Sequence, residues 1–449
     1  HMTHYFTDND KTQFIECGFD ILNDYLFINP LSIQKPEFHE NLIIHLYLIF
    51  KEQLINYISD NNIPKKEGII FIKACIKDSV NLFYKKTIPM RSYKTSYIRK
   101  DIDMEKMKKK IEFIKNTPQP DQRTNEWYLF RWNLLTASSI WQAFDSESNQ
   151  NRLIYNKCKP IDLAKYNKVN INSPMHWGNK YEPLSVMLYE KYYNTTVEDF
   201  GCIKHPKYDF IGASPDGIIT DEKSLRYGRM LEIKNVVSRK ITGIPKYEYW
   251  IQMQMQMETC DLNECDFLET AFKEYDTEDD YMNDGCGQYT EKGEKKGRFL
   301  MFFKDRKPHY EYPELNLTPE SSNQWEKNTI EELCNKGYTF TQYNYWYLEC
   351  VSCILVLRNK LWFKYAVPVL DSIWKKIIHD RENGYEHRAP KSRKPKKKKC
   401  LINVKKLFAN TEQDLEPKFE NNNNTINYVI DTPPLIANLN LNEILDIKI

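Results

Sequence analysis

Two acidic residues and a lysine in the middle of the sequence have the types and the spacing for metal-assisted chemistry on a phosphate. Asp216 lies in a Pro-Asp-Gly turn, and the short apolar strand expected after it carries Glu232 and Lys234. Residues two apart on a strand point to the same face, so this strand presents a carboxylate beside an ammonium. Mg²⁺ takes oxygen ligands and is usually held by one or two carboxylates together with substrate phosphate. The set therefore predicts Mg²⁺-assisted hydrolysis of a phosphodiester, with Lys234 orienting or deprotonating the attacking water.

A hairpin with an ordinary surface glutamate and lysine would show the same pattern, so the neighbouring motifs matter. Arg131 precedes 136–138, where a serine or threonine could cap the next helix, and a helix N-terminus beside an arginine suits a phosphate. Glu182 lies in the early turns of a helix expected to open at residue 175. A further helix is expected over 249–257, where the methionines suit core packing and a glutamine could face the site.

Composition restricts the class of protein more than it identifies partners. The 449 residues exceed one typical domain, and 64 basic against 62 acidic residues leave a net charge of +2 that says little about partners. Eleven cysteines at scattered spacings, with no secretory leader, favour reduced thiols inside a cell. No apolar run approaches the roughly 18 residues of a membrane span. We therefore expect a soluble intracellular protein.

The segments around the candidate site predict further features. Residues 3 to about 115 show helical spacing, and the basic, tyrosine-containing part from 84 to 115 suits either a phosphate backbone or a solvated helix face. The acidic, then Gly- and Lys-rich stretch 273–298 predicts a surface insertion. Cys350 and Cys353 lack partner cysteines at matching spacing, which favours a buried structural pair over a metal site.

Five motifs together resemble one known family. They are Glu126-Trp127 with Arg131 and Thr136-Ala137-Ser138, Trp177-Gly178-x-x-x-Glu182, Ser214-Pro215-Asp216-Gly217, Glu232-Ile233-Lys234, and Gln252-x-Gln254. Their order and approximate spacing are similar to those of the phage lambda-type exonuclease (YqaJ-like viral recombinase) family of the PD-(D/E)xK nuclease superfamily. The resemblance covers about 120 to 270 by motif and extends to 380 by pattern. A more distant similarity is to RecB-like nucleases of CRISPR adaptation, without their iron-sulfur cysteines. The Asn/Lys/Tyr/Ile-rich composition suggests an AT-rich genome, such as that of a giant DNA virus.

The resemblance implies a metal site. Asp216 and Glu232, with the carbonyl group of Ile233, would bind the catalytic Mg²⁺, for which Mn²⁺ should substitute. Glu182 would help to hold a second ion.

The resemblance also implies roles around that metal. Lys234 would activate the water and Gln254 would position it. The pocket for the 5′-phosphate of the recessed strand would consist of Arg131, Ser138 and Ser214. Asn133 stands where the family usually has a glycine, and the loop 221–228 looks long and is expected near the substrate.

These expectations combine into one prediction. The fold is α/β, with a PD-(D/E)xK restriction-endonuclease-like core of a mixed central sheet flanked by helices, and a mainly helical N-terminal unit. We expect a helical domain at 3–118, a lambda-exonuclease-like nuclease domain at 119–385 and a basic, low-complexity tail at 386–449. The predicted function is a Mg²⁺-dependent DNA exonuclease acting 5′ to 3′ from duplex ends in viral recombination, repair or foreign-DNA degradation. The alternatives are an endonuclease of the same superfamily and a noncatalytic DNA-binding recombination scaffold.

The implied partners follow from the same resemblance. They are double-stranded DNA ends, a single-strand annealing protein or helicase, and further copies of the chain in a homo-oligomer, with no membrane. The expected location is the cytoplasm or a viral replication compartment.

Overall fold

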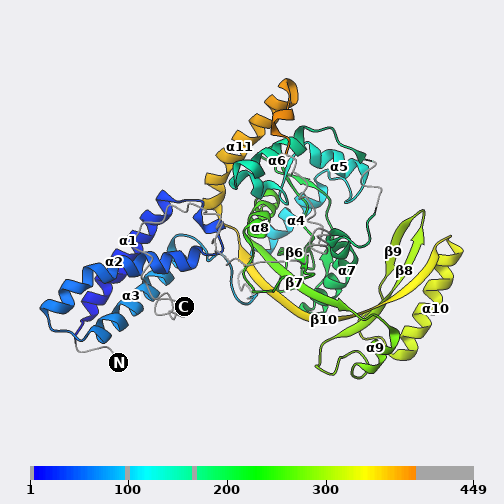
Figure 1. The fold of residues 1–449 in the computed structure, drawn as a ribbon, viewed down its shortest axis with the longest axis horizontal. Coiled ribbons are helices and arrows are strands. Elements are labelled where there is room, and N and C mark those ends of the chain that lie inside the picture. The colour runs from blue at the N-terminus through cyan, green and yellow to red at the C-terminus, as the bar shows by residue number, and fades with distance from the viewer. Residues whose placement is uncertain (1–4, 97–101, 164–168, 391–449) are drawn as a thin grey trace, which may run out of the picture. The chain divides into compact units, whose positions relative to one another are not determined.

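The computed structural model describes residues 5–96, 102–163 and 169–390, and its first part is helical, as predicted (Figure 1). Helices α1 (Asp8–Ile28), α2 (Phe38–Asp60) and α3 (Lys65–Lys86) pack against one another, with a short 3₁₀ helix at Ser32–Gln34 between the first two. Helix α1 begins at a capping box in which Thr7 accepts a hydrogen bond from Asp10 N and Asp10 accepts one from Thr7 N.

The basic segment after α3 binds groups of the same chain. Arg91 is buried and donates hydrogen bonds to the carbonyl oxygens of Pro245 (2.5 Å) and Gln34 (3.1 Å). The lysines of α4 (Met104–Asn116) form the ion pairs Lys108–Glu222 (3.2 Å), Lys110–Asp261 (2.7 Å) and Lys115–Glu198 (2.6 Å). These contacts weaken the interpretation of this segment as a binding surface for a phosphate backbone. Residues 97–101 lie outside the described residues.

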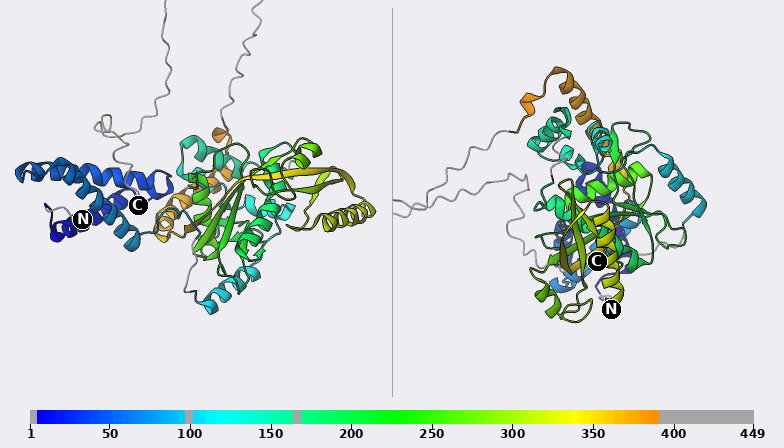
Figure 2. Two further views of the ribbon diagram at one scale, coloured as in Figure 1. Left: turned by 90° about the horizontal axis from the view of Figure 1, so that it is seen from below. Right: turned by 90° about the vertical axis from the view of Figure 1, so that its right-hand side faces the viewer.

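A mixed seven-stranded sheet forms the centre of the fold, as predicted (Figures 1 and 2). Its strands, in spatial order, are β2 (Val197–Glu198), β5 (Gly217–Ile219), β6 (Met230–Asn235), β7 (Glu264–Glu274), β10 (Thr339–Leu357), β8 (Lys296–Lys304) and β9 (Lys307–Glu311). Among the described strands of this sheet, only β6 and β7 pair in parallel, and helix α8 (Tyr247–Cys260) lies in the crossover that joins them. A second sheet has the order β1 (Leu135–Thr136), β4 (Ile211–Ala213) and β3 (Ile203–Lys204).

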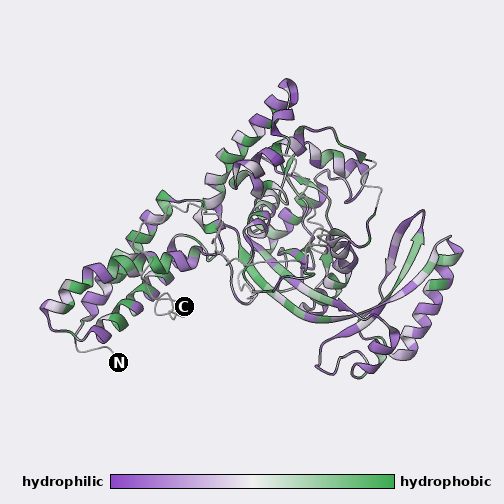
Figure 3. Cartoon of the chain, viewed as in Figure 1, coloured by the Kyte–Doolittle hydropathy of each residue, from purple (hydrophilic) through white to green (hydrophobic). Residues whose placement is uncertain are grey.

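Helices cover both faces of β6. On one face Leu231 and Ile233 pack with Tyr189 of α7 (Pro174–Tyr193), and on the other Glu232 binds a side chain of α8. The remaining helices are α5 (Asn125–Trp132), α6 (Glu147–Cys158), α9 (Glu278–Asn283), α10 (Pro319–Asn335), α11 (Lys360–Asn383) and 3₁₀ turns at Ile140–Phe144 and Glu386–Arg388. Figure 3 shows mainly hydrophobic residues on the inner strands and mainly hydrophilic ones on α10. Among the described residues, no helix combines the length and apolar character needed to cross a bilayer.

The structure extends one expectation about a local segment and corrects another. Residues 273–298 are mostly exposed, as predicted, and the structure adds that they contain helix α9 and the start of β8. Cys350 is exposed whereas Cys353 is partly buried, because residues three apart on a strand point to opposite faces. The predicted domain boundaries stay predictions, and the basic tail lies outside the described residues from 391 onward.

A buried charge cluster ties the loop between β5 and β6 to the core. The fully buried carboxylate of Asp266 on β7 binds Arg226 (2.6 Å) and Arg229 (3.1 Å), and it accepts hydrogen bonds from Tyr189 (2.7 Å) and Ser96 (2.6 Å). The loop leaves β5 at the end opposite to Asp216, and its expected place near the substrate stays a prediction. Its two arginines bind groups of the core.

We predict that Asp266→Asn destabilises the protein by about 3–5 kcal/mol, because it leaves buried guanidinium groups without their shared counter-charge. The shift of the denaturant unfolding midpoint measures this loss. Asp371→Asn removes an exposed ion pair with Lys375 and is the control, expected to leave the midpoint nearly unchanged. Equal midpoints for the two variants would contradict a supporting role of the cluster.

Candidate active site

The turn before β5 holds Asp216 against the backbone of β6. Strands β5 and β6 pair antiparallel with Gly217 opposite Leu231, which brings the preceding Asp216 beside Ile233. The Ile233 N–H donates a hydrogen bond of 2.7 Å to the Asp216 carboxylate. The carboxylate therefore has a fixed position at the edge of the sheet.

Glu232 and Lys234 lie on the face of β6 that meets α8. Glu232 is fully buried, and its Oε2 accepts a hydrogen bond of 2.7 Å from Gln256 Nε2. Its Oε1 contacts the Lys234 ammonium, which also lies 5.1 Å from the ring centre of Tyr249. The predicted carboxylate and ammonium are thus side by side.

The carboxylates of Asp216 and Glu232 lie close enough to affect each other's charge. Burial raises the pKa of Asp216 well above its usual range, and the neighbouring charge of Glu232 raises it further. Burial alone would lower the pKa of Lys234, but Glu232 and Asp216 outweigh it and raise that pKa. The site therefore favours a bound cation.

Glu182 reaches the same region from α7. Burial raises the pKa of Glu182, although the positive charges of Arg123 and Lys234 oppose this, and the Glu232 charge adds to it. Arg123 Nη2 lies 2.9 Å from the Glu182 carboxylate. Arg123 was not among the predicted residues, because it lies in a loop before α5 with no motif to mark it.

These residues fit a magnesium ion. Within the described ranges, no three His, Cys, Asp or Glu side chains converge as a complete ligand set. Mg²⁺ needs no such cage, because it keeps several waters and takes one or two carboxylates plus substrate oxygens. Asp216, Glu232 and the Ile233 carbonyl offer oxygen ligands of the right chemistry, and burial together with the Glu232 charge raises the pKa of Asp216, so a cation would favour its ionised form.

The structure brings Gln256, and not Gln254, to this group. Gln254 donates to the Leu357 carbonyl oxygen (2.9 Å) and accepts from Asn359 N (2.7 Å), so it anchors α8 to the end of β10. Gln256 donates to Glu232, and its buried Oε1 has no hydrogen-bond partner in the described part of the chain. A buried acceptor without a partner beside the Glu232 carboxylate suits a bound water. Residues two apart on a helix lie on nearly opposite sides, so Gln254 faces away from Glu232 when Gln256 binds it.

The three residues predicted to bind a phosphate meet in one place. Arg131 donates to the hydroxyl oxygens of Ser214 (3.3 Å) and Ser138 (3.0 Å). Its guanidinium lies 4.1 Å from the ring centre of Trp127, whose Nε1 also donates to Ser214 (3.2 Å). The expectation that a serine or threonine caps a helix here is wrong, because 140–144 form a 3₁₀ helix without a side-chain cap.

Two further basic side chains, Lys157 and Arg381, bind the backbone next to this pocket. Lys157 is buried and its Nζ donates to the Arg131 carbonyl oxygen (2.6 Å). Burial, with the charges of Arg131 and Arg381, lowers the pKa of Lys157 to about 7. Arg381 of α11 donates to the Lys157 carbonyl oxygen (2.8 Å) and lies over the ring of Trp132 (4.0 Å). Sequence motifs could not show this, because α11 is distant in the chain.

Ser214 connects the pocket with the carboxylates. Its hydroxyl group binds Arg131 and its carbonyl oxygen accepts a hydrogen bond of 3.3 Å from Gln256. Asp216 follows two residues later. One turn thus contributes to both groups of residues.

Comparisons with known proteins give three similarities. The model of the YqaJ-like viral recombinase domain matches residues 126–263. An uncharacterized protein of Acanthamoeba polyphaga mimivirus is 30% identical over 338 residues, which are 67% of this chain and 59% of that protein. The crystal structures of the alkaline exonuclease LHK-Exo from Laribacter hongkongensis, one of them in complex with dAMP, match with 18% identity and a TM-score of 0.34. Each match covers 58% of this chain and 95% of LHK-Exo.

We predict that Asp216→Asn stabilises the metal-free protein near pH 8. A raised pKa means that the neutral carboxyl favours folding and that this contribution is lost as pH rises through the folded-state pKa. The amide mimics the neutral form, so the thermal unfolding midpoint in EDTA should rise by roughly 2–4 °C per kcal/mol gained. Mg²⁺ should then stabilise the unmutated protein more than the variant.

The exposed Asp209 provides the control, since Asp209→Asn should leave the midpoint and its Mg²⁺ response unchanged. A midpoint for Asp216→Asn below that of the unmutated protein would show that the buried charge is not a source of strain.

Proposed function

Since residues 126–263 are a YqaJ-like viral recombinase domain, we propose that the protein is a metal-dependent deoxyribonuclease that degrades duplex DNA from its ends, 5′ to 3′. The observation that carries this proposal is the turn at 214–217, which joins the partly buried Asp216, beside the buried Glu232, to an arginine–serine pocket. The carboxylates suit a magnesium ion and the pocket suits a terminal phosphate. Their adjacency is what an enzyme that recognises and cuts a DNA end requires.

The residues of the carboxylate group have separable roles. Asp216, Glu232 and the Ile233 carbonyl would hold Mg²⁺ or Mn²⁺, which supplies positive charge to the scissile phosphate and lowers the pKa of the attacking water. Lys234, whose pKa is raised by both carboxylates, enters as the ammonium and donates hydrogen bonds to the water or to a phosphate oxygen. Gln256 holds Glu232 in place and offers its free Oε1 to that water.

Glu182 and Arg123 form the second part of the proposed metal region. Glu182 would take part in holding a second ion, and in the structure its carboxylate is neutralised by Arg123 at 2.9 Å. A guanidinium and a divalent cation are alternative partners for the same carboxylate. The pair therefore holds the Glu182 carboxylate in place until an ion replaces the guanidinium.

The pocket around Arg131 explains how a DNA end would be recognised. A guanidinium can donate two parallel hydrogen bonds to one phosphate, and stacking on Trp127 holds its plane. The two serine hydroxyls that now accept from Arg131 can turn to donate to the phosphate. Lys157 and Arg381 add positive charge beneath it.

The two alternatives differ in observable ways. An endonuclease of the same superfamily would share the metal residues but need no pocket for a terminal phosphate. A noncatalytic recombination scaffold would have no reason to keep Asp216 and Glu232 buried beside each other at an electrostatic cost. Single-strand annealing proteins, helicases and a homo-oligomer remain predicted partners.

The first experiment compares three DNA substrates in the presence of Mg²⁺. We expect degradation of linear 5′-phosphorylated duplex, slower degradation of linear 5′-hydroxyl duplex and no cutting of covalently closed circles, measured by release of acid-soluble nucleotides. Asp216→Ala should abolish the activity, because a metal ligand is lost.

Asp209→Asn controls for the loss of a carboxylate elsewhere and should keep full activity. Cutting of closed circles would favour the endonuclease, and no cutting of any substrate by the unmutated protein would favour the scaffold.

The second experiment tests the phosphate pocket. Arg131→Ala should reduce the preference for 5′-phosphate over 5′-hydroxyl ends by about 10- to 100-fold, because charged hydrogen bonds to a phosphate contribute about 1.5–3 kcal/mol. Rates on the two substrates, measured in parallel, give this ratio. Stability in Mg²⁺ should still rise as in the unmutated protein.

Arg152→Ala is a matched control, because Arg152 lies over Trp141 (6.0 Å) nearby but binds only Gln142 (3.2 Å) in the described contacts. An unchanged end preference in Arg131→Ala would refute the assignment of the pocket.

A further inference from the structure

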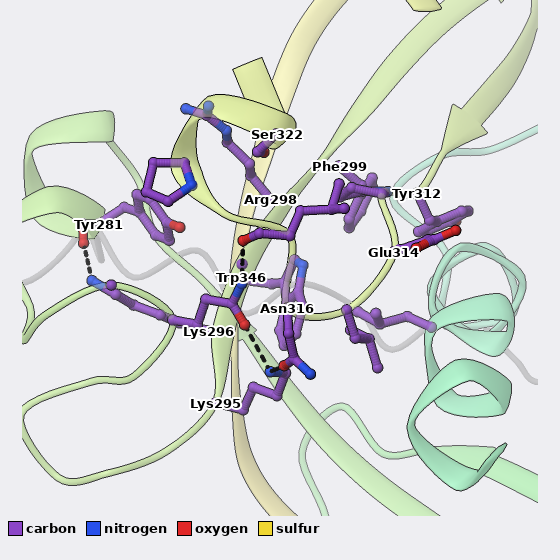
Figure 4. Close-up of a pocket in the computed structure, with 18 of the residues that line it drawn as sticks. Tyr281, Lys295, Lys296, Arg298, Phe299, Tyr312, Glu314, Asn316, Ser322 and Trp346 are labelled. Carbon is purple, nitrogen blue, oxygen red and sulfur yellow. Dashed lines mark hydrogen bonds between the residues drawn. The ribbon is translucent and has the colours of Figure 1, made fainter. Parts of the chain in front are cut away.

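A second cavity lies apart from the carboxylates, between α9, the strand β8, the segment 312–317 and the start of α10. Its volume is about 520 Å³, within the range of roughly 300–1,000 Å³ usual for small-molecule sites. Figure 4 shows the indole of Trp346 in the middle of its lining, with Lys295 and Asn316 on one side and Arg298 and Ser322 on the other. No part of the proposed mechanism uses this cavity.

One wall of the cavity is apolar and aromatic. Phe299 and Trp346 belong to a buried cluster with Leu184 of α7, and all three line the cavity. Gly297 lets the backbone of β8 lie against the indole, since a Cβ at this position would come within 2.8 Å of Trp346. This wall is therefore apolar and closely packed, and only small parts of the nearly buried Phe299 and Trp346 rings face the cavity.

The opposite side carries ammonium groups with only neutral partners. Lys295 Nζ donates to the side-chain oxygens of Gln288 (3.0 Å) and Asn316 (2.7 Å), and Lys296 Nζ donates to the carbonyl oxygens of Tyr281 (2.6 Å) and Asp284 (2.5 Å). Neither lysine forms an ion pair within the described part of the chain.

Among the described residues, Lys295 has no carboxylate partner, whereas Lys296 lies near Asp284 and its positive charge helps to lower the pKa of that carboxyl group. Arg298 is neutralised by Glu326 at 2.6 Å. Burial, together with the positive charge of Lys191, lowers the pKa of Lys295 to about 8. A half-buried ammonium with neutral partners is an incomplete arrangement that an anion would complete.

We propose that this cavity binds one nucleotide unit, with its phosphate at Lys295 and its base against the wall of Phe299 and Trp346. A bare phosphate would leave the apolar wall unused, and an apolar ligand would leave the ammonium group of Lys295 without a counter-charge. A nucleotide satisfies both sides at once. The unit is either a free mononucleotide or the end of a single strand, because both have the same chemistry.

The cavity and the candidate active site share helix α7. Leu184 lines the cavity two residues after Glu182, and Tyr312, which also lines it, donates a hydrogen bond to the Lys180 carbonyl oxygen. A ligand in the cavity thus contacts the helix that carries a proposed metal ligand. The inference goes beyond the proposed nuclease function and does not require cleavage.

The test uses the full chain carrying Asp216→Asn and Arg131→Ala, so that neither DNA cleavage nor the first phosphate pocket contributes. Calorimetric titration compares dAMP, 2-deoxyribose 5-phosphate, deoxyadenosine and a 5′-phosphorylated single-stranded hexamer. We expect dAMP to bind at least about tenfold more tightly than either fragment, because each fragment satisfies one side of the cavity only. Tighter binding of the hexamer identifies a strand end as the source, and tighter binding of dAMP identifies a free nucleotide.

Added substitutions locate the site. Lys295→Met should weaken dAMP binding by about tenfold or more, because a charged hydrogen bond is lost. Asn316→Asp should weaken dAMP binding similarly, because the new carboxylate neutralises Lys295. The two side chains have nearly the same shape, and residue 316 lies in an exposed loop. Lys292→Met removes an exposed lysine from the same segment and should change nothing.

Three results would overturn the proposal. They are no binding of dAMP, equal binding of dAMP and deoxyadenosine, and unchanged dAMP affinity in both Lys295→Met and Asn316→Asp. Thermal unfolding of each variant shows that it is folded. Since the titrations are independent of cleavage, failure here leaves the nuclease proposal untouched.

Discussion

The pairing of β5 with β6 brings the carboxylates of Asp216 and Glu232 close together, and neighbouring side chains provide hydrogen bonds and positive charge to them. Asp216 cannot move away, because the Ile233 N–H binds it, and Glu232 is fixed by the direction in which β6 presents its side chains. The ammonium of Lys234 and the amide of Gln256 provide positive charge and a hydrogen-bond donor here, whereas Glu182 adds a third carboxylate to the same region. The raised pKa of Asp216 shows that these donors do not compensate the negative charge completely.

The two helices beside β6 connect the carboxylates with other parts of the molecule. Helix α7 presents Glu182 toward the carboxylates, Tyr189 toward the buried Asp266 and Leu184 toward the second cavity. Helix α8 binds Glu232 through Gln256 and the end of β10 through Gln254. The charge cluster at Asp266 lies on β7 opposite Leu231, the neighbour of Glu232 on β6, so the same packed core supports the strands that carry the candidate site.

The sequence predicted residues that lie close together in the chain or in ordered motifs better than residues whose partners are distant in sequence. Asp216, Glu232 and Lys234 are close because adjacent strands and the two-residue period bring them together, and the motif order identified Arg131, Ser138 and Ser214. Gln254 was misplaced because alternating Gln and Met residues do not show which side of a helix faces inward. Arg123, Lys157 and Arg381 were missed because their partners are distant in sequence and no motif marks them. The roles of all these side chains in catalysis remain predictions.

Lys157 gives the phosphate pocket a property that its arginine cannot. With a pKa of about 7, this buried lysine is protonated in only part of the molecules near neutral pH, whereas Arg131 is always charged. If the pocket binds a phosphate as proposed, the anion would favour the protonated state of Lys157, and occupation of the pocket would take up protons from the solvent. Capture of a phosphorylated end would then be a proton-linked equilibrium, and its apparent enthalpy would vary with the ionisation heat of the buffer.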